Sequence, residues 1–196
     1  PNPAAQAAVL RAAYGDGNQG DALRASVHFV EAHGTGTRLG DPIELSALGG
    51  EKLGLSTGKG VLRCGSVKSN LGHLEGCSGL AGLLKASLCL SRADTENVVP
   101  RSLHFNTPNR HVQWDKLAVA VVGHQDEPFF PQQMPGRTTQ AAEPVVGVSS
   151  FGFGGALGHV ALRRKVSTTP KETSSRARNN GCFFVPVAAH SKASLK

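Results

Sequence analysis

Two histidines stand in similar surroundings, each following a predicted strand and lying inside a glycine-containing turn. His33 lies in residues 31–37, which read EAHGTGT, and His73 closes residues 70–73, which read NLGH. Loops at strand ends are the places where α/β sheets carry their sites. The pattern therefore indicates that both histidines are candidate functional residues.

His73 also stands directly before a predicted helix at residues 74–91. The positive end of a helix disfavours protonation, so we expect a neutral imidazole that donates a hydrogen bond. Lys68, five residues earlier, adds positive potential. The alternative is that each histidine only satisfies backbone groups of its own turn, and spacing alone does not identify a reaction.

Strands that alternate with helices surround these turns and predict an α/β sheet with helices on its faces. The expected helices cover residues 3–14, 41–53 and 74–91; the expected strands cover 26–32, 61–67 and 117–122, with a hairpin of 145–150 and 157–162. Residues 15–20 are expected to form a loop, 98–109 an irregular arm and 123–143 a polar loop.

Two of these helices carry local signals. For the first, Asp41 is the expected N-cap, Pro42 the first helical residue and Glu44 the capping-box partner three residues after the cap. The helix at 74–91 is apolar on nearly all sides, which predicts burial. Three glycines form a stripe that lets another backbone approach it, namely Gly76, Gly79 and Gly82.

Composition excludes several classes of function. Hydrophobic residues make up 39% of the 196-residue chain and charged residues 18%, enough for a globular core. The net charge of +7 is carried by residues 163–196, which hold eight Lys/Arg and one acid, whereas residues 1–162 are balanced. This distribution argues against a nucleic-acid-binding face on the core and predicts a basic flexible linker at 163–181.

The sequence also gives no sign of a membrane span or a metal site. The longest apolar stretch, residues 80–90, is interrupted by Lys85 and is too short to cross a bilayer. Neither the eight histidines nor the four cysteines have ligand spacing. We expect the cysteines to be reduced, mostly buried thiols of a cytoplasmic protein: Cys64, Cys77, Cys89 and Cys182. The glycine-rich run at 152–155 lacks the spacing of a phosphate-binding loop.

Four segments together resemble the successive motifs of ketosynthase (β-ketoacyl synthase) domains of modular polyketide synthases and animal-type fatty acid synthases. They are residues 30–48 (VEAHGTGTRLGDPIELSAL), 65–86 (GSVKSNLGHLEGCSGLAGLLKA), 100–114 (PRSLHFNTPNRHVQW) and 147–160 (GVSSFGFGGALGHV). The resemblance covers residues 1–162, in the family's order and spacing. Residues 182–196 resemble the start of the linker module that follows the ketosynthase.

The resemblance implies the C-terminal half of a thiolase-like fold, a mixed sheet flanked by helices. It implies decarboxylative Claisen condensation of an acyl thioester with a malonyl-type extender on an acyl carrier protein, which supplies phosphopantetheine. The chain itself is expected to bind no cofactor. The expected partners are the N-terminal half of the domain, the carrier protein and a second copy of the complete domain, with no nucleic acid and no membrane.

By resemblance, His33 and His73 are the two site histidines, which assist decarboxylation and hold the thioester oxygen as negative charge develops. Lys68 resembles the lysine that supports the second histidine. Glu75 resembles an acidic residue near it, and Phe153 resembles a phenylalanine gate beside the substrate channel. Further residues of the same motifs complete the expected site, namely Thr35, Thr37, Asn70, Gly154 and Gly155.

Two departures from the family pattern bear on activity. The nucleophilic cysteine belongs to a motif of the N-terminal half, and none of the four cysteines here lies in such a motif. Ala156 and Leu157 stand where the family usually has Thr and Asn. The chain begins at Pro1 without an initiator Met, so we expect a segment of a longer protein.

Two hypotheses follow from these departures. The chain is part of a ketosynthase whose cysteine lies upstream, or it is a non-catalytic remnant or interaction module. In both, we expect the chain alone to be inactive and poorly soluble, because the helix at 74–91 lacks the packing partner of a complete domain.

Overall fold

The computed structural model describes residues 2–15, 17–50, 60–93, 95–129 and 144–163, which lie in one compact unit, Pro1–Lys165. The predicted linker, apart from Arg163, lies outside the described residues. So do the following module, Cys182 and most of the predicted loop at 123–143.

The site is built on a five-stranded mixed sheet of order β4-β2-β1-β6-β7. Its strands are β1 (Val27–Glu31), β2 (Leu62–Gly65), β4 (Val119–Val121), β6 (Val145–Phe151) and β7 (Leu157–Arg163). The first four in spatial order are parallel, and β7 pairs antiparallel with β6 as the predicted hairpin. All five predicted strands are therefore confirmed, with β1 at the centre of the sheet.

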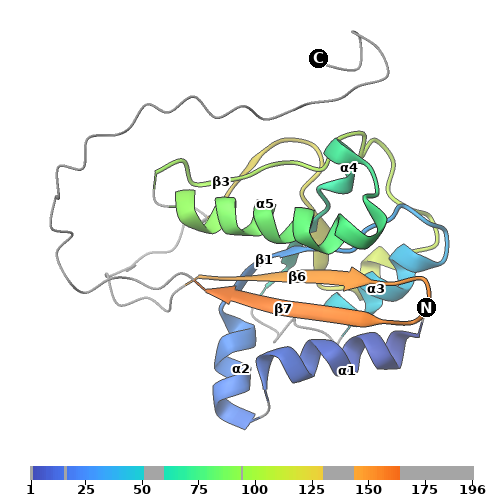
Figure 1. Cartoon of the computed structure of the whole chain (residues 1–196), viewed down its shortest axis with the longest axis horizontal. Helices are drawn as coiled ribbons and strands as arrows, with labels where there is room; N and C mark the ends of the chain where they lie inside the picture. Colours follow the sequence, from blue (N-terminus) through green and yellow to red (C-terminus); the bar gives the residue numbers. More distant parts are fainter. Residues whose placement is uncertain (1, 16, 51–59, 94, 130–143, 164–196) are drawn as a thin grey trace, which may run out of the picture. The chain divides into compact units, whose positions relative to one another are not determined.

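Helices cover both faces of this sheet (Figure 1). α1 (Pro3–Tyr14) and α3 (Gly40–Gly49) pack together on one face, and α5 (Ser78–Arg92) packs on the other. Neighbouring residues of β1 point to opposite faces, as in any strand. Val30 accordingly joins the core beneath α1 and α3, while Phe29 joins the core beneath α5. This arrangement confirms a sheet flanked by helices.

The remaining elements are short connections around the sheet. They are α2 (Gly17–Ala25), α4 (Lys68–Leu71), the 3₁₀ turns η1 (Glu75–Cys77) and η2 (Trp114–Lys116), and a two-stranded antiparallel pair of β3 (Val98–Val99) with β5 (Glu127–Pro128). No helix in the part of the chain that the structure describes is long and apolar enough to cross a membrane.

Helix α2 replaces much of the loop predicted at residues 15–20. Its two glycines disfavour a helix by propensity, which is why the sequence pattern missed it. Arg24 stabilises α2, because it pairs with Asp21 one helical turn earlier. It also donates to the carbonyl oxygen of Gly15, which precedes the helix, at 2.6 Å. These contacts outweigh local propensity.

Helix α3 begins differently from the predicted cap. Leu39 occupies the N-cap position without a side-chain cap, and the helix ends at Gly49 rather than at residue 53. The Asp41 carboxylate instead accepts a hydrogen bond from the backbone N–H of Gly36 at 3.1 Å. Asp41 therefore holds the glycine-rich turn that follows His33.

Helix α5 differs from its prediction in its start and in its burial. It begins at Ser78 rather than Leu74, because Glu75 adopts a positive φ of 47° and interrupts the helical path. The prediction of burial on all sides is wrong, since leucines spaced four apart leave one face exposed: Leu80, Leu84 and Leu88. This face is an exposed apolar surface.

Two of the predicted buried cysteines are confirmed and one is not. Cys64 on β2 and Cys89 on α5 are buried. Cys77 is exposed, because it lies in the 3₁₀ turn before α5 and not within the helix.

Candidate active site

The two histidines meet at one edge of the sheet. β1 and β2 are parallel neighbours, so the loops after them leave from the same edge. His33 follows β1 by two residues, and His73 follows the short helix α4 that comes after β2. Their ring centroids lie 5.5 Å apart with the ring planes at 83°. The two rings are therefore close neighbours.

The hairpin fixes the orientation of His33. The backbone N–H of Phe151, at the end of β6, donates to His33 Nδ1 at 3.3 Å, and the two rings lie 5.6 Å apart. A neutral imidazole that accepts at Nδ1 carries its proton on Nε2. His33 is thereby prepared as a donor through Nε2–H.

His73 is held in the same way by its own turn. The backbone N–H of Glu75 donates to His73 Nδ1 at 3.1 Å. Glu75, which has a positive φ of 47°, starts the 3₁₀ turn η1 directly after this contact. The same tautomer follows, with the proton on Nε2. Glu75 thus contacts the site through its backbone, and its side chain is exposed.

The surroundings of His33 disfavour its charged form. Burial lowers the pKa of His33 to about 4, and the neighbouring Lys68 and His73 add to that effect. Burial also lowers the pKa of Lys68, while Glu31 and Glu44 oppose this. The resemblance pairs Lys68 with His73, and the structure shows that its charge also acts on His33.

Glu44 is the site residue that sequence reasoning missed. Its two carboxylate oxygens accept hydrogen bonds from the backbone N–H groups of His33 at 2.7 Å and Gly34 at 2.9 Å. Burial raises the pKa of Glu44 to about 7, against the two N–H donors that lower it. The only signal was its place three residues after Asp41, which we interpreted as helix capping. Glu44 instead holds the His33 loop.

Three other predicted residues lie around this loop and the α4 turn. Thr35 lines a cavity of about 310 Å³, together with Glu44 and Lys68. Thr37 shapes the loop, because its hydroxyl accepts from the backbone N–H of Gly40 at 3.0 Å. Asn70 accepts a hydrogen bond from the Ser69 hydroxyl at 3.2 Å.

The hairpin turn holds the remaining predicted residues. Phe153 is fully exposed at the turn. Gly154 precedes Gly155, whose φ of 95° favours glycine. The turn closes through the backbone, since the N–H of Gly152 donates to the Ala156 carbonyl oxygen at 2.7 Å.

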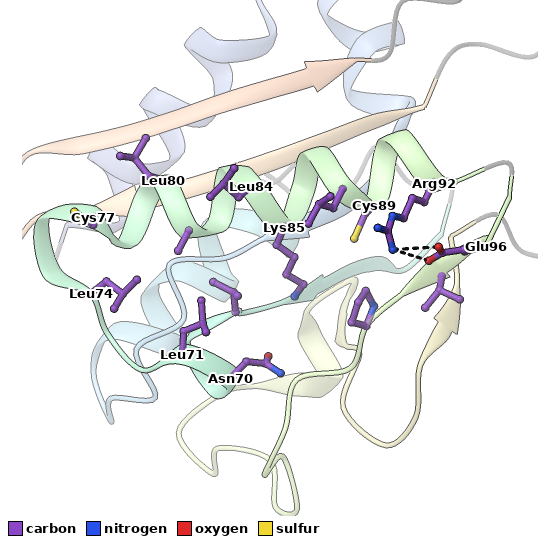
Figure 2. A pocket seen from close by; sticks show the side chains of 15 residues that line it. Asn70, Leu71, Leu74, Cys77, Leu80, Leu84, Lys85, Cys89, Arg92 and Glu96 are labelled. Carbon is purple, nitrogen blue, oxygen red and sulfur yellow. Dashed lines mark hydrogen bonds and ion pairs between the residues drawn. The ribbon is translucent and has the colours of Figure 1, made fainter. Parts of the chain in front are cut away.

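An apolar groove of about 590 Å³ runs along α5 (Figure 2). Leu71 and Leu74, close to His73 in the sequence, lie at one end, and the Arg92–Glu96 ion pair, at 3.1 Å, lies at the other end. Between them lie mainly apolar side chains, including Leu80, Leu84, Leu88 and Val98. The groove combines the exposed leucines of α5 with side chains of the α4 turn and of residues 96–100.

Comparison with known proteins identifies the family. The family model described as beta-ketoacyl synthase, C-terminal domain, matches residues 1–106, which is more than half of the chain. The chain belongs to the β-ketoacyl synthase family. The resemblance drawn from the four motifs is therefore confirmed.

Its relatives include polyketide synthases. The chain is 43% identical over 175 residues to a phenolphthiocerol/phthiocerol polyketide synthase of Mycobacterium tuberculosis, covering 87% of the chain and 8% of that protein. It is 42% identical over 163 residues to erythronolide synthase EryA3 of Saccharopolyspora erythraea, covering 83% of the chain and 5% of that protein. The chain thus spans a small fraction of the synthases that it matches.

Solved ketosynthase structures share its fold. The ketosynthase domain OzmH KS7 for oxazolomycin, from Streptomyces albus JA3453, superposes with a TM-score of 0.70 at 30% identity, covering 87% of this chain and 28% of that one. The module 6 ketosynthase of the bacillaene synthase from Bacillus subtilis 168 gives 0.69 at 31% identity, covering 85% and 27%. These matches show the fold of a ketosynthase portion.

Proposed function

We propose that the chain is the histidine-bearing part of a polyketide ketosynthase. The reaction is decarboxylative Claisen condensation of an acyl thioester with a malonyl-type extender. The observation that carries the proposal is the His33–His73 pair, with ring centroids 5.5 Å apart and a backbone donor on each Nδ1. Membership of the β-ketoacyl synthase family supports it.

The two Nε2–H groups provide the chemistry. When the extender loses CO₂, the electrons of the broken C–C bond move to the thioester carbonyl, and its oxygen becomes negative. Two neutral N–H donors stabilise that oxygen. The enolate carbon then attacks the acyl carbonyl and forms the new C–C bond. The C–S bond of the acyl thioester breaks, which releases the thiolate of the cysteine that held the acyl group. The depressed pKa of His33 keeps its imidazole neutral at physiological pH.

The nucleophilic cysteine comes from another part of the complete domain. Cys64 is buried on strand β2, and burial raises the pKa of its thiol, so it is a poor nucleophile. Within the described residues the apolar groove along α5, lined by Leu71 and Leu74 close to His73 in the sequence, offers a surface for the missing half. We assign the nucleophile to that half and predict that the chain alone is inactive.

The further partners belong to the same proposal. An acyl carrier protein brings the extender on its phosphopantetheine arm, and the complete domain forms a homodimer. The reduced thiols Cys64, Cys77 and Cys89 favour a reducing compartment such as the cytoplasm.

The test replaces His73 by alanine in a complete domain that supplies the cysteine. Condensation with a malonyl carrier should fall by about 10²–10³, as for the loss of an oxyanion donor. The matched control is His111→Ala, which removes an exposed histidine hydrogen-bonded to Arg38. Unchanged condensation in the His73→Ala variant would refute the assignment.

A non-catalytic remnant is the second candidate, favoured by Ala156 and Leu157. Their backbone closes the hairpin turn, and neither side chain carries the hydroxyl or the amide usual in the family. If this candidate is right, the assembled domain will form no condensation product, and Ala156→Thr with Leu157→Asn will restore it.

A further inference from the structure

Glu31 is a buried carboxylate that the proposed reaction does not use. It ends β1, and its side chain is 1% exposed. Its two oxygens have different partners: Oε1 accepts from the backbone N–H of Val67, and Oε2 lies 2.8 Å from Lys85 Nζ. One carboxylate therefore connects β1 to the start of α4 and to the middle of α5.

These two partners flank the segment that carries His73. Val67 is the N-cap residue of α4, and Lys85 lies in α5 beyond the 3₁₀ turn. Glu31 itself stands two residues before His33. The same side chain thus joins the loop of one histidine to both ends of the segment that carries the other.

The pair packs closely against the sheet, and Lys85 also borders the apolar groove along α5. Lys85 leaves α5 on the side away from Leu80 and Leu84 (Figure 2), and its side chain is 10% exposed. Its ammonium lies 5.2 Å from the ring centroid of Phe29. α5 approaches Glu31 closely at Gly82, where a Cβ would lie 3.1 Å from Glu31 Cγ.

The energetics argue for a role other than stability. Among the described residues, Glu31 Oε2 and Lys85 Nζ have no hydrogen-bond partner besides their mutual ion pair. Burial raises the pKa of Glu31, opposed by Lys85 and the Val67 N–H. A buried ion pair is often no more stabilising than apolar residues of the same volume, whereas its geometry is specific.

We propose that Glu31 and Lys85 act as positioning residues, a buried clasp that sets the His73 segment against the His33 loop. The proposal rests on the proposed function of the two histidines. The carboxylate fixes both flanks of residues 67–85, and its charge also acts on Lys68. Without the clasp, the α4 turn is free to shift relative to β1, and the histidine pair loses its spacing.

The test uses the full chain and readouts that need no condensation. The double variant Glu31→Leu with Lys85→Met replaces the two charged side chains by apolar ones of similar volume, and so removes the acceptor oxygens and the ammonium group. Hydrogen exchange of residues 67–78, followed by mass spectrometry, should accelerate about tenfold or more relative to β6 and β7. The pH at which His33 is half modified by diethyl pyrocarbonate should rise, because Lys68 moves away from it.

Controls separate positioning from stability and from the proposed function. Glu96→Gln removes an exposed carboxylate paired with Arg92 at the end of α5 and should change neither readout. Normal exchange at 67–78 and an unchanged His33 profile in the double variant would overturn the proposal. If that variant fails to fold by circular dichroism, Glu31→Gln, which removes the charge and replaces one acceptor oxygen by an amide NH₂, must raise the midpoint of the His33 profile or the proposal fails. The activity of His73→Ala tests the proposed function independently.

Discussion

At the scale of single residues, backbone N–H groups determine what each histidine can do. Phe151 and Glu75 donate to Nδ1 of His33 and His73, so both rings keep a proton on Nε2. The charge state of His33 depends on burial and on Lys68. This electrostatic link between Lys68 and His33 can be tested directly.

Lys68→Met should raise the pKa of His33 from about 4 toward its ordinary value of 6.5, because a nearby positive charge disfavours the imidazolium. The pH dependence of diethyl pyrocarbonate modification at His33, read by mass spectrometry, measures the shift. Lys116→Met, an exposed lysine in η2, is the control. A midpoint that stays or falls would contradict the electrostatic account.

At the scale of elements, a buried hydrogen-bond chain attaches α1 to the sheet. The Tyr14 hydroxyl and His159 Nε2 lie 2.9 Å apart, and His159 Nδ1 lies 2.9 Å from the Ser149 hydroxyl. Burial lowers the pKa of His159 to about 4. The unfolded chain protonates His159 near its ordinary pKa of 6.5, whereas the folded chain does so only near pH 4. Acid should therefore favour unfolding.

The free energy of unfolding should therefore fall by about 3 kcal/mol between about pH 7 and about pH 4 because of His159 alone. Urea denaturation of the wild type and of His159→Gln measures this as a difference in slope with pH. His33 titrates in both proteins and cancels in the comparison. Parallel pH dependences in the two proteins would show that His159 is not buried as the neutral form.

Two glycines make a second prediction at this scale, Gly82 in α5 and Gly76 in η1. A Cβ at Gly82 would meet Glu31 and Val148, whereas one at Gly76 would meet nothing within 4 Å. Gly82→Leu should cost about 1–3 kcal/mol of unfolding free energy through overpacking, measured as a lower urea midpoint. Gly76→Leu is the matched control. A Gly82→Leu variant as stable as the control would show that α5 packs more loosely on the sheet.

At the scale of the whole molecule, the sheet has a hydrophobic core on each face, one beneath α1 and α3 and one beneath α5. The outer face of α5, however, presents leucines to solvent. Such a face is typical of a missing partner.

Leu84→Glu should reduce the binding of a fluorescent apolar dye by the chain and increase its solubility, since Leu84 is 66% exposed in the groove. Val61→Glu, at a residue 62% exposed outside the groove, should have much less effect. Equal effects of the two substitutions would show that general surface charge, and not the groove, controls dye binding.

The chain alone should take no acyl group from a radiolabelled acyl thioester, because covalent catalysis requires an activated thiol. Labelling should appear only when the cysteine-bearing half is supplied. Stable thioester formation on Cys77, the exposed thiol, together with condensation, would show that the chain contains a complete site.

The sequence by itself determined the strands, the family and the two histidine turns, because these depend on local periodicity and on motifs of fixed spacing. It could not reveal the role of Glu44, whose spacing from Asp41 also suits a helix cap. Nor could it show that Glu31 joins Val67 and Lys85, since those contacts form only when distant segments pack. The one-sided burial of α5 was likewise decided by tertiary structure: its apolar residues surround the helix, but the sheet covers only one side.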